Sequence, residues 1–510
     1  MIIGGFILFL TLWFGIGPDS AVYSYCASVW KHDGLPPYVG CMECDYPGIF
    51  IIHRMSLLFG ETALGFRIFD VLFQLGSLVM IFYLAKRVSS LSLAGFLASL
   101  FYALYYYKLW FPMVGEREGF VLFFLLLSVT ISLIFSQKVF TRAVLVGLLS
   151  GFVFLVKPTY GLVWPMFGVW FLIEGFKRRD QKFWIESCVY MTGCLAPALM
   201  VILFYQRLGH LNDLIELTIT FAFQVYAKLP YYAAVSGKSI YMTYANMPGF
   251  IWENIVVENL WVLLGGILGL PLTWLFGDRH ERKLFWVLLA SIAISLVSIV
   301  IMRGVWEYYR ITFWGFFMIL SGSAYGLLFQ KIRGKGSAAR WALACCFLVL
   351  VIGLTIIRIP RDVITFALRY SFRPLETAYM AQYPLPLETA EYVKLVMRPE
   401  DEIYYFGNIS MLPFLINKKL GAPFPFTTHL FQRLPDGRLH PVQEKWRRQY
   451  LETFFKLKPR FFIYDDGCQH CPEGSFRPIF KKEFPDLSQA LEKNYHLVKK
   501  FDKIEIYELN

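Results

Sequence analysis

Charged residues are scarce in this sequence. Asp, Glu, Lys and Arg make up only 17% of its 510 residues, whereas 57% are hydrophobic and 18% are aromatic. Soluble globular chains carry about 25% charged and about 45–50% apolar residues, so the composition argues against an ordinary soluble protein. The sequence also lacks internal repeats and low-complexity stretches, which argues against a repeat array.

Long apolar runs take the place of the missing charge. A helix that crosses a bilayer needs about 20 mostly apolar residues. Eleven stretches meet this requirement: 1–16, 66–85, 91–109, 119–136, 141–156, 159–175, 184–204, 258–277, 284–302, 311–329 and 341–359. The sequence therefore predicts a polytopic α-helical membrane protein with about 11 transmembrane helices. The stretch 141–175 is broken at Lys157 and Pro158, and a short re-entrant hairpin is the alternative there.

Basic residues concentrate in alternate short loops between these runs, as at Lys86 and Arg87 and again at Arg282 and Lys283. Such loops stay in the cytoplasm, which places the N-terminus inside and the loops 17–65 and 205–257 outside. The net charge of +12 then reflects topology, and we expect no nucleic-acid partner. No basic segment precedes the first run, so we interpret it as a span and not a cleaved signal peptide.

The last part of the chain changes character near residue 360. Charges spread throughout 361–510, and short apolar runs at 402–407, 460–465, 496–501 and 503–509 are typical of strands. Helical patterns run over 386–397 and 443–457. We therefore predict a transmembrane domain over 1–360 and a small extracytoplasmic α/β domain over 361–510.

Acidic residues mark the outer ends of two predicted spans. Asp19 follows the first span, and Glu116, Arg117 and Glu118 begin the fourth. Ionisable residues at a membrane boundary are costly, so they are candidates for function. Asp19 is either a helix cap or a general base, and the other three are either a solvated loop or part of a site. Asp19 and Glu118 are also candidate ligands for a divalent cation, Mg²⁺ or Mn²⁺.

Cationic and aromatic residues lie on the same side. Lys157 stands between apolar walls, where it either binds an anionic lipid phosphate or extends toward the headgroups. The segment from Arg303 to Arg310 joins two spans and contains Tyr308 and Tyr309. Aromatic belts explain many such rings, but sugar-binding sites also use them.

Four cysteines form two pairs of C-x-x-C spacing on the outer side, Cys41 with Cys44 and Cys468 with Cys471. Disulfides are usual outside the cytoplasm. Each pair closes on itself, or the two pairs cross-link, or all four cysteines bind zinc. Cys26 is expected to be an ordinary packing residue.

The order of these features resembles the GT-C superfamily of membrane glycosyltransferases, in particular the branch of protein O-mannosyltransferases and the lipid A aminoarabinose transferase. Asp19 resembles the family's catalytic acidic residue at the start of the first outer loop, and Asp45 to Gly48 resembles the proline motif of that loop. Glu116 to Glu118, Leu155 to Thr159 and Arg303 to Arg310 resemble the later motifs. Aminoarabinose transferases have Glu-Lys-Pro-Pro where this chain has Asp45 to Gly48, so the lysine expected there is absent, which favours a less specific sugar transferase.

The resemblance implies inverting transfer of one hexosyl or pentosyl unit from a polyprenyl-phosphate donor to a glycan, lipid or protein acceptor on the outer face of the inner membrane. Asp19 would be the base, and Glu118 or Glu116 would orient it. The implied substrate-binding residues are Lys157, Arg117, Asp45, Tyr46, Arg303, Tyr308, Tyr309 and Arg310. The alternatives are a polymerase or ligase of lipid-linked glycans, and a transporter. The sequence lacks the paired broken helices in two related halves that are typical of many transporters.

Overall fold

The structure is a computed structural model that describes residues 1–510 except 179–181, 229–245, 277–278, 304–305, 335–336 and 468–473. The chain divides into two compact units, each built from three stretches of sequence. Unit 1 comprises Met1–Phe14, Arg67–Val201 and Met242–Ala378, and unit 2 comprises Gly15–Phe66, Ile202–Tyr241 and Tyr379–Asn510.

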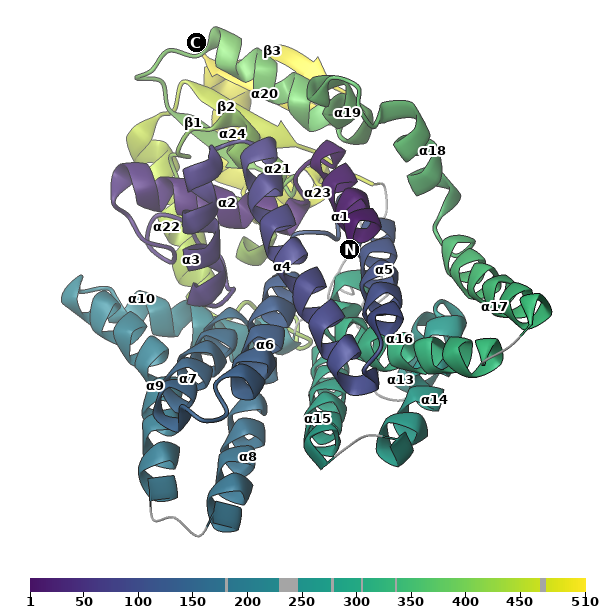
Figure 1. Ribbon diagram of the computed structural model, residues 1–510. Helices are drawn as coiled ribbons and strands as arrows, with labels where there is room; N and C mark the ends of the chain where they lie inside the picture. Colours follow the sequence, from purple (N-terminus) through teal and green to yellow (C-terminus); the bar gives the residue numbers. More distant parts are fainter. Residues whose placement is uncertain (179–181, 229–245, 277–278, 304–305, 335–336, 468–473) are drawn as a thin grey trace. The chain divides into compact units, whose positions relative to one another are not determined.

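Unit 1 is helical (Figure 1). Its helices are α1 (Ile2–Phe9), α4 (Ala63–Ser89), α5 (Ser92–Lys108), α6 (Arg117–Ile134), α7 (Val139–Val156), α8 (Val163–Arg178), α9 (Lys182–Arg207), α13 (Met247–Ile251), α14 (Leu260–Phe276), α15 (Arg279–Met302), α16 (Ile311–Arg333), α17 (Ala338–Ile356), α18 (Arg361–Tyr370) and α19 (Leu375–Gln382). Helices α4, α9 and α19 extend into unit 2 at one end.

Each of the eleven predicted runs coincides with a helix. In the described part of the chain, seven helices are long and apolar enough to cross a membrane, or nine if two bent helix pairs each count as one span. Helices α5 and α8 are slightly shorter, at 17 and 16 residues. A single 3-10 turn, Pro158–Tyr160, separates α7 from α8 at the predicted break. The prediction of a polytopic helical membrane protein is confirmed.

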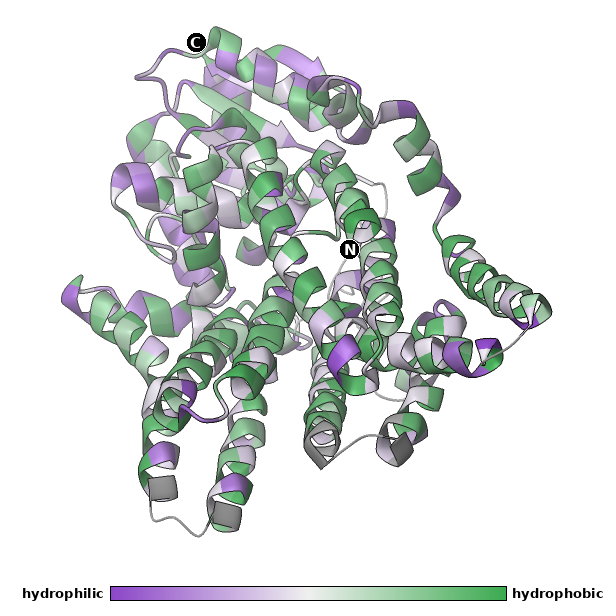
Figure 2. Ribbon diagram, viewed as in Figure 1, coloured by the Kyte–Doolittle hydropathy of each residue, from purple (hydrophilic) through white to green (hydrophobic). Residues whose placement is uncertain are grey.

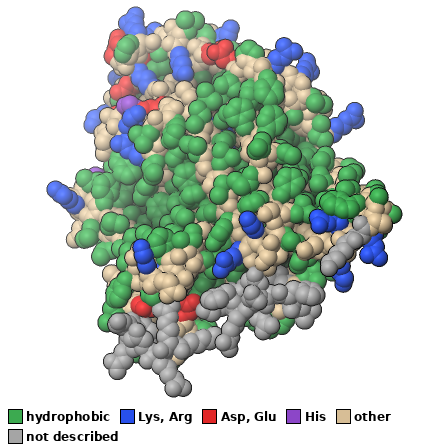
Figure 3. Space-filling view, viewed as in Figure 1, with side chains coloured by type: hydrophobic (Ala, Val, Ile, Leu, Met, Phe, Trp, Pro, Cys, Tyr) green, Lys and Arg blue, Asp and Glu red, His purple; other side chains and the backbone are tan. Residues whose placement is uncertain are grey.

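Helix burial differs strongly within unit 1. The most apolar window of the α16 span is 89% buried inside the protein, whereas that of α17 is 11% buried. Gly322 on α16 lies so close to α5 that a Cβ atom there would stand 2.6 Å from the carbonyl oxygen of Ala94. Figure 2 shows that α17 is nevertheless hydrophobic along its length, and on the face drawn in Figure 3 hydrophobic side chains cover much of the surface. Exposed apolar side chains of this kind suit contact with lipid.

Unit 2 contains a four-stranded sheet in the order β1-β2-β4-β3, formed by β1 (Ile403–Phe406), β2 (Phe461–Asp465), β3 (Tyr495–Phe501) and β4 (Ile504–Leu509). Strand β1 is parallel to β2, and β4 is antiparallel to both β2 and β3. Its helices are α2 (Pro18–Asp33), α3 (Pro47–Ser56), α10 (Leu211–Ile215), α11 (Ala222–Gln224), α20 (Pro384–Val396), α21 (Met411–Ile416), α22 (Pro441–Leu457), α23 (Arg477–Glu483) and α24 (Pro485–Asn494).

The aromatic core of this sheet explains its formation. Strands β1 and β2 are buried at every position, and the rings of Tyr404, Phe462 and Phe454 contact one another. Alternation is absent because both faces of these strands are covered. The predicted strands at 402–407, 460–465, 496–501 and 503–509 and the predicted helices at 386–397 and 443–457 are confirmed. The boundary at 360 stays a prediction.

Candidate active site

The start of α6 and the end of α7 bring opposite charges together in unit 1. Helix α7 ends at Val156 because Pro158 cannot continue it, and Lys157 before the proline takes an extended conformation with φ −154° and ψ 99°. The Lys157 side chain is only 3% exposed and forms an ion pair with Oε1 of Glu118. Glu118 lies in the first turn of α6 and is fully buried. Two residues that lie far apart in the sequence therefore form one buried charged pair.

One carboxylate oxygen of Glu118 is left unused by its ion pair with Lys157. Within the described residues, Glu118 Oε2 has no hydrogen-bond partner. The ring of Tyr309 lies 4.2 Å from the Lys157 ammonium, a cation–π contact, and Tyr309 packs edge-on against Tyr308. Unsatisfied buried oxygens are costly and mark positions where a ligand group can bind.

Arg310 is another buried cation of unit 1. Its Nη1 donates to the backbone oxygen of Asn254 at 2.8 Å and lies 3.4 Å from a carboxylate oxygen of Glu258. Within the described residues its Nε has no hydrogen-bond partner. Arg303, at the end of α15, and Arg117, the first residue of α6, are only half-buried. The structure thus brings Lys157, Glu118 and Tyr309 together.

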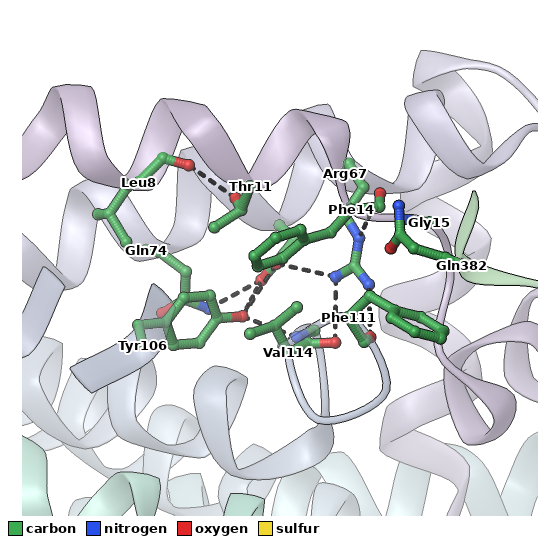
Figure 4. Close-up of polar contacts among 12 residues, drawn as sticks. Leu8, Thr11, Phe14, Gly15, Arg67, Gln74, Tyr106, Phe111, Val114 and Gln382 are labelled. Carbon is green, nitrogen blue, oxygen red and sulfur yellow. Dashed lines mark hydrogen bonds and ion pairs between the residues drawn. The ribbon is translucent and has the colours of Figure 1, made fainter. Parts of the chain in front are cut away.

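The loop that leads into α6 is fixed by a buried polar network that the sequence-based predictions did not include (Figure 4). The guanidinium of Arg67 donates to the carbonyl oxygens of Phe14, Phe111 and Val114 at 3.3, 3.0 and 3.0 Å. Its Nη1 also lies 3.5 Å from Asp70, with both side chains fully buried. Arg67 therefore ties the loop between α5 and α6 to helix α4.

The second half of this network surrounds Asp70. Tyr106 donates to both carboxylate oxygens at 2.8 and 2.9 Å, and Gln74 donates to one of them at 2.9 Å. The Tyr106 hydroxyl in turn accepts the backbone N–H of Gly115 at 2.7 Å. Gly115 has φ +77°, which favours glycine. Glu116, the N-cap of α6, follows immediately and is fully buried.

The signal for this network was present in the sequence. Arg67 and Asp70 are two opposite charges three residues apart inside a predicted span, where charges are rare and face the protein interior. The pairing of Arg67 with Asp70 was nevertheless not among the predictions.

Unit 2 holds the other predicted acid. Asp19 is the second residue of α2, after Pro18 in the first helical position, and its side chain is half-buried. Tyr23 lies one turn further along the same helix and donates a hydrogen bond to the Asp45 carboxylate. Tyr38 donates to the backbone oxygen of Asp45 at 2.6 Å. Asp45 is thereby held against the α2 face that also carries Asp19.

Two tyrosines near Asp45 act as neutral donors. Burial raises the pKa of Tyr38 well above its ordinary value and also raises the pKa of Tyr46. The Tyr46 hydroxyl donates to the backbone oxygen of Thr218 at 3.1 Å. Tyr46 was predicted to bind substrate. Its hydroxyl group is used in this hydrogen bond, and the residue is half-buried.

The cysteine predictions are wrong for Cys41 and also for Cys26, which was expected to be an ordinary packing residue. Cys41 forms a disulfide with Cys26, with a Cα–Cα distance of 5.2 Å, and not with Cys44 or a zinc ion. Cys26 lies on α2, and the loop that follows the helix folds back along it, so the partner is not the neighbour in sequence. Cys468 and Cys471 lie outside the described residues. No group of three or more His, Cys, Asp or Glu side chains suited to a metal occurs in the described part of the chain.

Comparison with known proteins finds similarity to solved structures only, and this similarity concerns the fold. No protein-family model and no curated protein matches the chain. Two crystal structures of ArnT from Cupriavidus metallidurans are similar, both at 13% identity. The one bound to undecaprenyl phosphate has a TM-score of 0.57 and covers 99% of this chain and 96% of ArnT. The apo state has a TM-score of 0.53 and covers 99% and 97%. The predicted GT-C-like membrane fold is confirmed.

Proposed function

We propose that this integral membrane protein transfers a single sugar, with inversion, from a polyprenyl-phosphate donor to an acceptor outside the cytoplasm. The observation that carries the proposal is the buried Lys157–Glu118 pair under the Tyr309 ring, in a fold similar to that of ArnT, whose crystal structure contains undecaprenyl phosphate. A buried ammonium suits a phosphate group.

Lys157 and Arg310 stabilise the leaving phosphate in this proposal. As the bond between the anomeric carbon and the phosphate oxygen breaks, negative charge grows on the phosphate, and fixed cations lower the energy of that state. An ammonium has three N–H donors, and Glu118 accepts from one of them. Glu118 holds the ammonium in place, and its Oε2 accepts a hydrogen bond from a substrate hydroxyl.

Asp19 acts as the general base. The acceptor hydroxyl oxygen attacks the anomeric carbon from the face opposite the phosphate, its proton passes to the Asp19 carboxylate, and polyprenyl phosphate leaves. The opposite-face attack inverts the configuration. Tyr23, one turn after Asp19 on α2, donates to the Asp45 carboxylate, and Asp45 binds acceptor hydroxyls. The positive-inside pattern favours an N-terminus in the cytoplasm.

The test is release of polyprenyl phosphate from polyprenyl-phosphate sugars by the purified protein in lipid vesicles, with a pool of candidate acceptors. We expect release by the wild type and none by Asp19→Asn, because an amide cannot accept the proton. Asp33→Asn is the matched control, since Asp33 ends the same helix and is exposed. Wild-type release in Asp19→Asn would remove Asp19 from the mechanism. Donor that neither binds nor reacts would overturn the proposal.

A further inference from the structure

Helix α18 (Arg361–Tyr370) follows α17 after a linker of four residues, and Pro360 is its N-cap. The helix is amphipathic (Figure 2). At 100° per residue its polar side chains share one arc, which consists of Arg361, Asp362, Thr365 and Arg369. The remaining six positions form a wider apolar arc, which consists of Val363, Ile364, Phe366, Ala367, Leu368 and Tyr370.

One side of the apolar arc packs against unit 1. Val363 and Phe366 are buried. The Phe366 ring lies 4.5 Å from that of Trp110 and 6.0 Å from that of Phe14. Just after the helix, Trp13 Nε1 donates to the backbone oxygen of Arg373 at 2.8 Å. These contacts fix the rotation of α18 about its own axis.

The other side of the apolar arc is uncovered by the protein. Leu368 is 84% exposed and Ile364 is 37% exposed, and the neighbouring Phe372 and Ile357 are 65% and 76% exposed. Single exposed apolar residues are common, but a contiguous group beside the end of a membrane span is not.

The charges around this patch identify what covers it. Arg358, Arg361, Arg369 and Arg373 are all exposed. Asp362 and Glu376 are the acidic residues of the segment 357–376. An apolar face flanked by an excess of arginines is complementary to the headgroup and acyl boundary of an anionic membrane.

The preceding helix brings α18 to that boundary. Helix α17 is the most exposed of the candidate spans in the described part of the chain. A linker of four residues reaches at most about 14 Å, so α18 begins close to the membrane surface at which α17 ends.

We propose that α18 lies in the interfacial layer of the membrane, with Ile364 and Leu368 among the upper acyl chains and the four arginines among anionic lipid headgroups. Contact of this surface with lipid does not require sugar transfer. The helix contacts Trp110 in the loop between α5 and α6, so the membrane surface braces the loop that leads to Glu116.

The test uses the full chain in vesicles of phosphatidylcholine with phosphatidylglycerol, with fluorescent dansylalanine incorporated in place of Leu368. The matched control carries dansylalanine in place of Leu395 on α20, which is also 84% exposed but belongs to unit 2. Both sites tolerate a larger side chain because they are exposed. Doxyl-labelled lipids then report contact with acyl chains by quenching.

We expect several-fold stronger quenching and blue-shifted emission at position 368 relative to position 395. We also expect weaker quenching at position 368 when phosphatidylglycerol is left out or when Arg361 and Arg369 are both replaced by Gln. Absence of quenching at position 368, or equal quenching at both positions, would overturn the proposal. Quenching that is unchanged both without phosphatidylglycerol and after replacement of Arg361 and Arg369 would overturn the role given to the headgroups.

Discussion

Replacement of Arg67 by Met tests whether the network in Figure 4 positions the start of α6. Methionine is long, flexible and uncharged, so the change removes the donors and keeps most of the packing volume. It leaves the carbonyl oxygens of Phe14, Phe111 and Val114 without their donor. It also leaves the buried Asp70 carboxylate without its cation.

Two estimates bound the expected loss of stability. Hydrogen bonds inside membrane proteins contribute about 0.6 kcal/mol each on average, so three of them give a lower bound of about 2 kcal/mol. Loss of one partner from a buried ion pair costs about 3–5 kcal/mol, because a buried charge is left uncompensated. We therefore expect Arg67→Met to lower the free energy of unfolding by about 2–5 kcal/mol, and the added change Asp70→Asn to restore part of it.

The assay is a double-mutant cycle of Arg67→Met and Asp70→Asn, with unfolding measured by titration with sodium dodecyl sulfate in mixed micelles. Sugar-transfer activity is measured on the same samples. We expect a coupling energy above about 1 kcal/mol and reduced activity in Arg67→Met under conditions where the variant stays folded. Additive effects, or a stability loss below about 0.5 kcal/mol, would refute the role of Arg67 in holding the loop.

Three further predictions follow from the same contacts. Lys157→Met should lower the free energy of unfolding by about 3–5 kcal/mol, because Glu118 is left buried and unpaired. Adding Glu118→Gln should restore stability but not donor binding. Donor binding equal to that of the wild type would contradict the phosphate role of Lys157. Burial lowers the pKa of His429 to about 4, so the unfolded state takes up a proton first as pH falls below about 6.5. The free energy of unfolding should therefore drop by about 2.5 kcal/mol between pH 7.5 and pH 4.5. His429→Phe should flatten this part of the stability profile, and an unchanged slope would count against the role of His429. Cys26→Ser should lower the free energy of unfolding of unit 2 by about 3 kcal/mol, the chain entropy of a loop of about 15 residues, and should leave a free thiol at Cys41 that can be alkylated without prior reduction. Proteolysis equal to that of the wild type would exclude this.

Hydropathy predicted where the helices are, because the apolar requirement of a span is local to each stretch of sequence. It did not predict which helices face lipid. The α17 window has mean hydropathy 2.2 and the α16 window 1.5, yet the less apolar helix is the one enclosed by protein. Close packing in α16 depends on small residues such as Gly322, whose role is visible only once its neighbour on α5 is known.

The candidate site was predicted as a set of residues and not as a set of contacts. Lys157 and Glu118 were both named from their positions at span ends, but their pairing depends on how α6 and α7 pack. The Cys26–Cys41 disulfide was missed because the C-x-x-C spacing favoured neighbours in sequence, whereas the loop after α2 folds back on the helix.

The enclosed position of α16 has a consequence for how the protein is made. Helix α5 packs against α16 through Ala94 and Gly322, but α5 is synthesised and inserted long before α16 leaves the ribosome. The face of α5 that receives α16 must therefore wait in the membrane, covered by lipid or by an insertion factor, until the later part of the chain arrives. Truncation before residue 311 would leave that face permanently open, so the N-terminal helices cannot reach their final packing during early synthesis.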